Sequence, residues 1–345
     1  MIISAGSQRP CHPAACSSGR GCDSFTSETG WIKDVIASNA AGSAGGAKNL
    51  VRQKFMSDGW NEYASTYDQT LACVSRIFCY DMISAMNFFQ NQRILDIGCG
   101  TGSFERAVSD VIDSYNIPTP FYILAIDYSE GMLDHLRTKL LPRLFTLGIV
   151  PSRFELNTQE IDGESLEGIP DDSFDTAVSC FGIVLFSNRD KCFSNILRVL
   201  KRDGQLIFNV WEPTAKGIGF GIIDMVNAIT QHLASNNPAD PGFRPPEQPV
   251  KASQALMLEA LSAAGFVRAA AFSTYHSTCF QSRDHLWDWL LRCSPRIGRP
   301  LAALAPGEAA ALKLAVLDKL APEQPGGEPR VVLTNHGVTY VARKP

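Results

Sequence analysis

The chain has 345 residues, of which 45% are hydrophobic and 19% charged, enough for one principal domain of roughly 250 residues with appended segments. Its formal net charge is -4 at pH 7, and no run of Lys and Arg interleaves with aromatic residues. This balance excludes nucleic acid as the expected partner. No apolar stretch approaches the roughly 18 residues that a spanning helix requires, so we expect a soluble protein.

The ten cysteines are scattered and form no CxxC pair, a usage that favours a reducing compartment over a secreted disulfide scaffold. Three of them, Cys11, Cys16 and Cys22, lie close to His12 near the N-terminus. Their spacing matches no zinc module. We therefore predict no metal site.

Residues 1–48 carry little hydrophobic periodicity and end in a run rich in Gly, Ala and Ser, which predicts an extension without fixed structure. The start of this extension is Ser-rich and has no acid before Asp23, as in transit peptides, but it lacks an arginine-rich amphipathic helix. We expect a cytoplasmic protein, with organelle targeting by the extension as the alternative. A helical cap is expected over 49–92, ahead of the main domain at 93–345.

From about residue 55, strand-like and helix-like segments alternate, the order that builds a doubly wound α/β fold with helices on both faces of a mostly parallel sheet. Seven short apolar runs are the expected strands. They span 93–97, 121–126, 153–156, 174–179, 205–210, 267–274 and 331–341. The clearest helices are expected at 129–140, 191–200 and 252–264, and insertions at about 212–250 and 282–330 are expected to form a helical lid.

The segment 93–104 runs from an apolar strand through a glycine-rich turn into a helix. Gly98, Gly100 and Gly102 allow a tight turn and the close approach of a ligand to backbone N–H groups. A dinucleotide site would have a third glycine at the position of Ser103. A nicotinamide dehydrogenase is therefore the disfavoured alternative.

Two carboxylates accompany this turn. Asp96 precedes it within the strand, where a negative charge suits a cationic amino group and would repel a pyrophosphate. Asp127 ends the second strand, where it can accept hydrogen bonds from ribose hydroxyls; its competing interpretation is a helix cap. Together they favour S-adenosylmethionine as the cofactor.

These segments resemble the class I S-adenosylmethionine-dependent methyltransferases, a broad group that includes the quinone-biosynthesis C-methyltransferases. The resemblance covers roughly 56–345. Its motifs are 95–102, 125–132, 161–166, 170–175, 179–182 and 198–206. In the last of these, Arg202 and Asp203 replace the usual Pro-Gly. The signature that the quinone enzymes carry is absent beyond Tyr67 and Asp68, so quinone modification is one option among several.

The resemblance implies a set of site residues. Those expected to bind the cofactor are Asp96, Gly98, Cys99, Gly100, Gly102, Asp127, Tyr128, Met132, Asp162, Gly163, Glu164 and Cys180. Those expected to cap it or to contact the substrate are Trp60, Tyr63, Tyr67 and Phe181. For the two tyrosines, core packing against the sheet is an equal alternative.

The expected reaction is methyl transfer to a small molecule, with O, N, C or S as the acceptor atom. A general base is optional, because the sulfonium leaving group is already activated and the protein mainly positions the acceptor. His232, His276 and His285 are the candidates should a base be needed. The alternative is a regulatory or accessory subunit that binds the cofactor without catalysis. The sequence does not indicate an oligomeric state.

Overall fold

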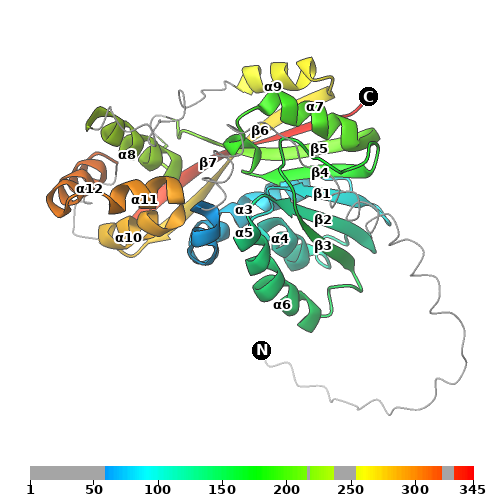
Figure 1. Cartoon of the computed structure of the whole chain (residues 1–345), viewed down its shortest axis with the longest axis horizontal. Helices are drawn as coiled ribbons and strands as arrows, with labels where there is room; N and C mark the ends of the chain where they lie inside the picture. Colours follow the sequence, from blue (N-terminus) through cyan, green and yellow to red (C-terminus); the bar gives the residue numbers. More distant parts are fainter. Residues whose placement is uncertain (1–58, 216–217, 237–253, 321–329) are drawn as a thin grey trace, which may run out of the picture.

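The computed structural model describes residues 59–215, 218–236, 254–320 and 330–345 (Figure 1). The expected N-terminal extension, the first part of the cap and the cysteine group around His12 lie outside these ranges. Within them, no helix is both long and apolar enough to cross a bilayer.

Seven strands form one sheet in the order β3-β2-β1-β4-β5-β7-β6. They are β1 (Arg93–Ile97), β2 (Phe121–Asp127), β3 (Phe154–Glu160), β4 (Phe174–Cys180), β5 (Leu200–Glu212), β6 (Val267–Phe280) and β7 (Val331–Arg343). The first five are parallel, and β7 is antiparallel to β5 and β6. The doubly wound class is confirmed. The strand order reverses between β1 and β4, so their carboxyl ends form the crevice where such sheets bind ligands.

All seven strands occur where the sequence predicts them, but β3, β5 and β6 are each at least three residues longer than predicted. β6 continues to Phe280 because its second half pairs with β7 as far as Val331. β5 begins at Leu200, which was expected to end a helix. The expected turn at 201–204 is a bulge inside β5, because Leu200 already pairs with β4 and the regular register resumes only at Gln205.

Helices cover both faces of the sheet (Figure 1). One apolar cluster joins the sheet to α3 (Leu71–Ser84), α4 (Ser103–Val111), α5 (Glu130–His135) and α6 (Leu141–Thr146). A second cluster joins it to α7 (Arg189–Val199) and α9 (Gln254–Ala263).

The helix expected over 129–140 starts correctly, with the Ser129 side chain accepting a hydrogen bond from Met132 N, but it changes character midway. A π-helical turn, η1 (Leu136–Leu140), separates α5 from α6. Pro142 is the reason. It has no N–H to donate to the carbonyl four residues earlier, so the regular α-helical bond pattern cannot continue through it.

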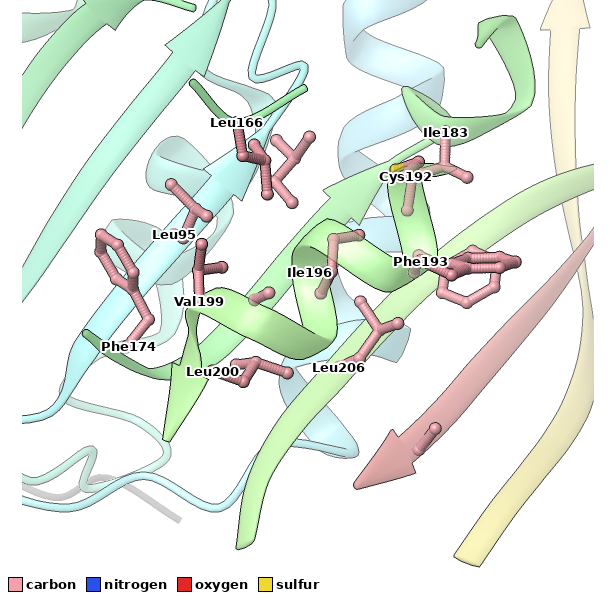
Figure 2. Packing of buried hydrophobic residues seen from close by; sticks show 14 of the residues in the cluster. Leu95, Leu166, Phe174, Ile183, Cys192, Phe193, Ile196, Val199, Leu200 and Leu206 are labelled. Carbon is pink, nitrogen blue, oxygen red and sulfur yellow. The ribbon is translucent and has the colours of Figure 1, made fainter. Parts of the chain in front are cut away.

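The packing of α7 on the sheet is close (Figure 2). Phe193, Ile196 and Val199 are fully buried on α7 and meet Leu95 and Leu206 of the central strands. Their spacing of three residues places them on one face of the helix. This layer fixes the crevice at the ends of β1 and β4.

Four further helices stand together at one end of the sheet (Figure 1). They are α8 (Ile222–Asn236), α10 (Arg283–Cys293), α11 (Pro295–Ala302) and α12 (Pro306–Leu320). They share an apolar cluster with α3 and with the extended ends of β6 and β7. The first expected insertion contains α8 after a non-helical segment, and the second contains α10, α11 and α12. Their function as a lid is a prediction.

We expect Phe193→Ala to lower the free energy of unfolding by about 3–5 kcal/mol, because it leaves a cavity under α7. Denaturant unfolding followed by circular dichroism measures this change. The control is Phe145→Ala, because Phe145 is 53% exposed and its loss should change stability by less than about 0.5 kcal/mol. Similar losses in both variants would contradict the packing described.

Candidate functional site

The turn after β1 requires glycine for two reasons. Gly98, Gly100 and Gly102 have φ angles of 69°, 57° and 92°, in the left-handed region that other residues rarely adopt. A Cβ atom on Gly102 would lie 2.5 Å from the side chain of Leu140. The turn is fixed to the neighbouring strand, because Gly98 N donates a hydrogen bond to Ile126 O at 2.8 Å.

Asp127 holds the same turn from the end of β2. Its carboxylate accepts hydrogen bonds from Gly100 N and from Ser129 N, each at 2.9 Å. The side chain is buried, and burial raises its pKa to about 6. Each carboxylate oxygen keeps acceptor capacity beyond one bond. Asp127 therefore supports the local backbone much as a helix cap does, which was its alternative interpretation. It can still accept hydrogen bonds from ribose hydroxyls.

Asp96 and a second acid, Glu105 of α4, form a buried pair. Their exposed fractions are 1% and 0%, and no other residue in the described ranges donates a hydrogen bond to either carboxyl group. Burial, with the charge of Glu105, raises the pKa of Asp96 well above its usual range, and burial raises that of Glu105 to about 7. Two adjacent buried acids cannot both ionise at low cost. A cationic ligand group fits beside them, as the sequence predicts for Asp96.

The sequence did not predict Glu105. An acid in the first turn of a helix usually faces solvent and complements the helix dipole, and Glu105 occupies such a position. Here it points inward instead.

The helical residues 59–69 cover the turn. The ring of Tyr67 lies 3.7 Å from the Cβ position of Gly100, and Trp60 packs against Tyr67 with ring centroids 5.7 Å apart. Trp60 also belongs to an apolar cluster with Met132 and Tyr128. Four residues expected at the cap or cofactor site, Trp60, Tyr67, Tyr128 and Met132, thus lie together near the turn.

Tyr63 lies elsewhere. Its hydroxyl oxygen is 2.2 Å from the Cβ position of Gly298 in α11, and neighbouring Glu62 forms an ion pair with Arg299 at 2.5 Å. On the other side of the segment, Asn61 Oδ1 accepts a hydrogen bond from Ser129 Oγ at 2.8 Å. Residues 59–69 therefore connect the start of α5 to α11.

At the end of β4, Phe181 forms an aromatic wall. Its ring stacks on Trp211 with centroids 3.7 Å apart, and Phe78 meets both rings edge-on. The backbone of Phe181 is in the left-handed region with φ 57°, and its N–H donates to Asn209 Oδ1 at 2.9 Å. Cys180, one residue earlier, is half-buried. The sequence did not predict Phe78, Trp211 or Asn209, since nothing local distinguishes them from core residues.

Local hydrogen bonds and close packing hold Asp162, Gly163 and Glu164, the expected site residues in the turn after β3. Asp162 Oδ1 accepts from Glu164 N at 3.0 Å. A Cβ atom on Gly163 would lie 2.5 Å from the ring of Phe186. The carboxylate of Glu164 accepts a hydrogen bond from Ser187 N, so it ties this turn to the segment that follows β4.

The three candidate histidines are dispersed. His232 and His285 are exposed on α8 and α10. His276 Nε2 lies 2.8 Å from Asp81 Oδ2, and its ring meets Phe78 edge-on with centroids 4.6 Å apart. Of the three, His276 borders the aromatic wall, through Phe78.

A family model described as a methyltransferase domain matches residues 95–208, the span from the glycine turn to the middle of β5. The match agrees with the domain that the sequence predicts, and the predicted enzyme class, a methyltransferase that uses S-adenosylmethionine, is confirmed. The glycine turn and the buried carboxyl groups of Asp96 and Asp127 fit a nucleoside that carries a cationic group.

Relatives come from quinone biosynthesis. The chain is 28% identical to the ubiquinone/menaquinone biosynthesis C-methyltransferase UbiE of Pasteurella multocida (strain Pm70) over 195 residues, 54% of this chain and 68% of that protein. It is 28% identical to the demethylmenaquinone methyltransferase of Bacteroides fragilis (strain YCH46) over 152 residues, 43% and 56% of the two chains. A crystal structure of a putative methyltransferase from Bacillus halodurans C-125 has a TM-score of 0.48 and 17% identity, covering 77% of this chain and 98% of that one.

We expect S-adenosylmethionine binding to weaken as the pH falls below about 6, because protonation of Asp127 removes its negative charge and part of its acceptor capacity. Asp127→Asn should bind at least tenfold more weakly at pH 8 and lose the part of the pH dependence centred near 6. Calorimetric titrations between pH 5 and 8 measure both effects. The exposed Asp134→Asn in α5 is the control. An unchanged wild-type affinity over this range would contradict the assignment.

The Asp96–Glu105 pair should release a proton when S-adenosylmethionine binds at pH 7, because a nearby cation favours the ionised form of both acids. Calorimetry in two buffers of different ionisation enthalpy reports the number of protons released. Glu105→Gln should reduce it, whereas the exposed Glu130→Gln should leave it unchanged. Equal heats in the two buffers for the wild type would show that the pair does not face the cofactor.

Proposed function

We propose that this protein transfers the methyl group of S-adenosylmethionine to a small, apolar, ring-containing acceptor that lies against Phe181 and Trp211. The observation that carries the proposal is the aromatic wall at the end of β4, on the edge of the sheet that also carries the glycine turn and its buried acids.

The cofactor end of the site is polar and negatively charged. Asp127 is suited to the ribose hydroxyls, and the Asp96–Glu105 pair to the amino group. Trp60 and Tyr67 cover the turn and exclude water. When bound, S-adenosylmethionine supplies a methyl group already activated by the sulfonium, so the protein needs no nucleophile of its own.

The acceptor end is apolar. Phe78, Phe181 and Trp211 belong to or pack on the cluster that also holds the buried side chains of α8, α10, α11 and α12. Flat apolar ligands gain from stacking on such rings and from removal from water. The main contribution of these residues to the reaction is to orient the acceptor and to keep it dry.

The names of two relatives, from ubiquinone and menaquinone biosynthesis, support a quinone-type ring as the first acceptor to test. The family signature expected after Tyr67 and Asp68 is missing, so other aromatic acceptors belong in the same trial. The acceptor atom in this proposal is a ring carbon or a ring hydroxyl oxygen.

The test is incubation with methyl-labelled S-adenosylmethionine and a panel of soluble naphthoquinols and phenols, with products identified by mass spectrometry. We expect one class of ring acceptor to be labelled. Phe181→Ala and Trp211→Ala should raise the KM for that acceptor about tenfold, through lost stacking worth about 1 kcal/mol or more, and leave cofactor affinity within twofold. The exposed Phe89→Ala serves as the control.

Cofactor binding without labelling of any acceptor would contradict catalysis and favour the alternative of an accessory subunit. Labelling of charged, non-aromatic acceptors alone would retain the methyltransferase and contradict the aromatic wall as its acceptor surface.

A further inference from the structure

A cavity of about 330 Å³ lies outside the site described above, between α3, α4 and the helical stretch from α5 to α6. Four cationic side chains line it: Arg76 of α3, Arg106 of α4, Lys139 of η1 and Arg143 of α6. They come from separate elements, and the fold brings them to one opening. Lys139 and Arg143 are four residues apart, a spacing that places side chains on one helical face.

These cations are under-compensated. None of the four forms an ion pair with a residue in the described ranges. Burial and the charges of Arg76 and Arg143 lower the pKa of Arg106, so the like charges act on one another.

Two acids are near, and both have other partners. Asp68 lines the cavity, where it lies 3.2 Å from His135 Nε2 and accepts a hydrogen bond from Thr101 Oγ1 at 3.2 Å. The charge of Asp110 acts to raise the pKa of Arg106, but the Asp110 carboxylate accepts a hydrogen bond from the hydroxyl of Tyr80 at 3.0 Å. Four cations thus face one lining carboxylate, an arrangement that repels itself unless an anion enters.

The cavity is distinct from the methyl-transfer site. It shares Gly102 with the residues expected to bind the cofactor, but Asp96, Asp127 and Phe181 do not line it. Thr101 and Gly102 form its boundary with the glycine turn, so a ligand bound here would contact the outer part of that turn without occupying the cofactor crevice.

We propose that this cavity binds a phosphate-bearing ligand with at least two negative charges. Arginine guanidinium groups bind phosphate oxygens in a bidentate manner, and two arginines with partial burial, Arg76 and Arg106, flank the opening. A singly charged carboxylate would leave most of the positive charge unbalanced. The phosphate could belong to a soluble organic phosphate or to a lipid headgroup, which present the same chemistry to these side chains.

Calorimetric titration of the full chain with inorganic diphosphate at low salt is the first test. We expect one-to-one binding that weakens at least tenfold in Arg76→Gln/Arg106→Gln and also in Lys139→Gln/Arg143→Gln. The second pair is exposed, so its replacement leaves the core intact. Arg202→Gln, an exposed cation outside the cavity, should have no more than a twofold effect. Affinity for S-adenosylmethionine should stay within twofold in every variant, which separates this proposal from the methyl-transfer site.

A second arm measures co-sedimentation with phosphatidylglycerol vesicles. Vesicle binding that both double variants abolish, without diphosphate binding, assigns the phosphate to a lipid headgroup; diphosphate binding alone assigns it to a soluble ligand. Absence of both interactions in the wild type overturns the proposal, as does an equal loss in Arg202→Gln.

Discussion

The close attachment of the glycine turn to β2 is the constraint on which the rest of the site depends. Backbone N–H groups of Gly98 and Gly100 are held by Ile126 O and by the carboxylate of Asp127, so the ends of β1 and β2 move as one unit. The turn is left-handed at three glycines, so any larger residue would strain its backbone, and at Gly102 it would also collide with Leu140. The cap, the buried acids and the start of α4 are all positioned from this junction.

On the two sides of that junction, the candidate site has a charged half and an apolar half. On one side, the carboxyl groups of Asp96, Glu105 and Asp127 are withdrawn from water. On the other, Phe181 belongs to the apolar cluster shared with α8, α10, α11 and α12. Residues 59–69 touch both halves, since Asn61 bonds to Ser129 and Glu62 pairs with Arg299. The separation matches a reaction between a cationic donor and an uncharged acceptor.

The sequence predicted the sheet well because its parallel strands are buried on both faces and therefore appear as short, continuous apolar runs. It predicted the glycine turn and Asp127 because each stands at the end of such a run. Glu105 was missed because its burial depends on α4 packing above Asp96. Of the aromatic wall, Phe181 was predicted, but Phe78 and Trp211 were missed because they come from segments distant in the sequence. The start of β5 was misplaced because register, which determined the bulge at 201–204, is a property of paired strands.

Phe181 has a strained backbone and also belongs to the proposed acceptor surface. A bulky side chain in the left-handed region costs about 1–2 kcal/mol, and here the hydrogen bond that Phe181 N donates to Asn209 Oδ1 and the stacked ring of Trp211 maintain it. Glycine at this position would relax the backbone and remove the ring in one change. If the ring holds the acceptor as proposed, thermal robustness and acceptor preference are opposed at a single codon, and selection for a more heat-resistant enzyme erodes its selectivity here first.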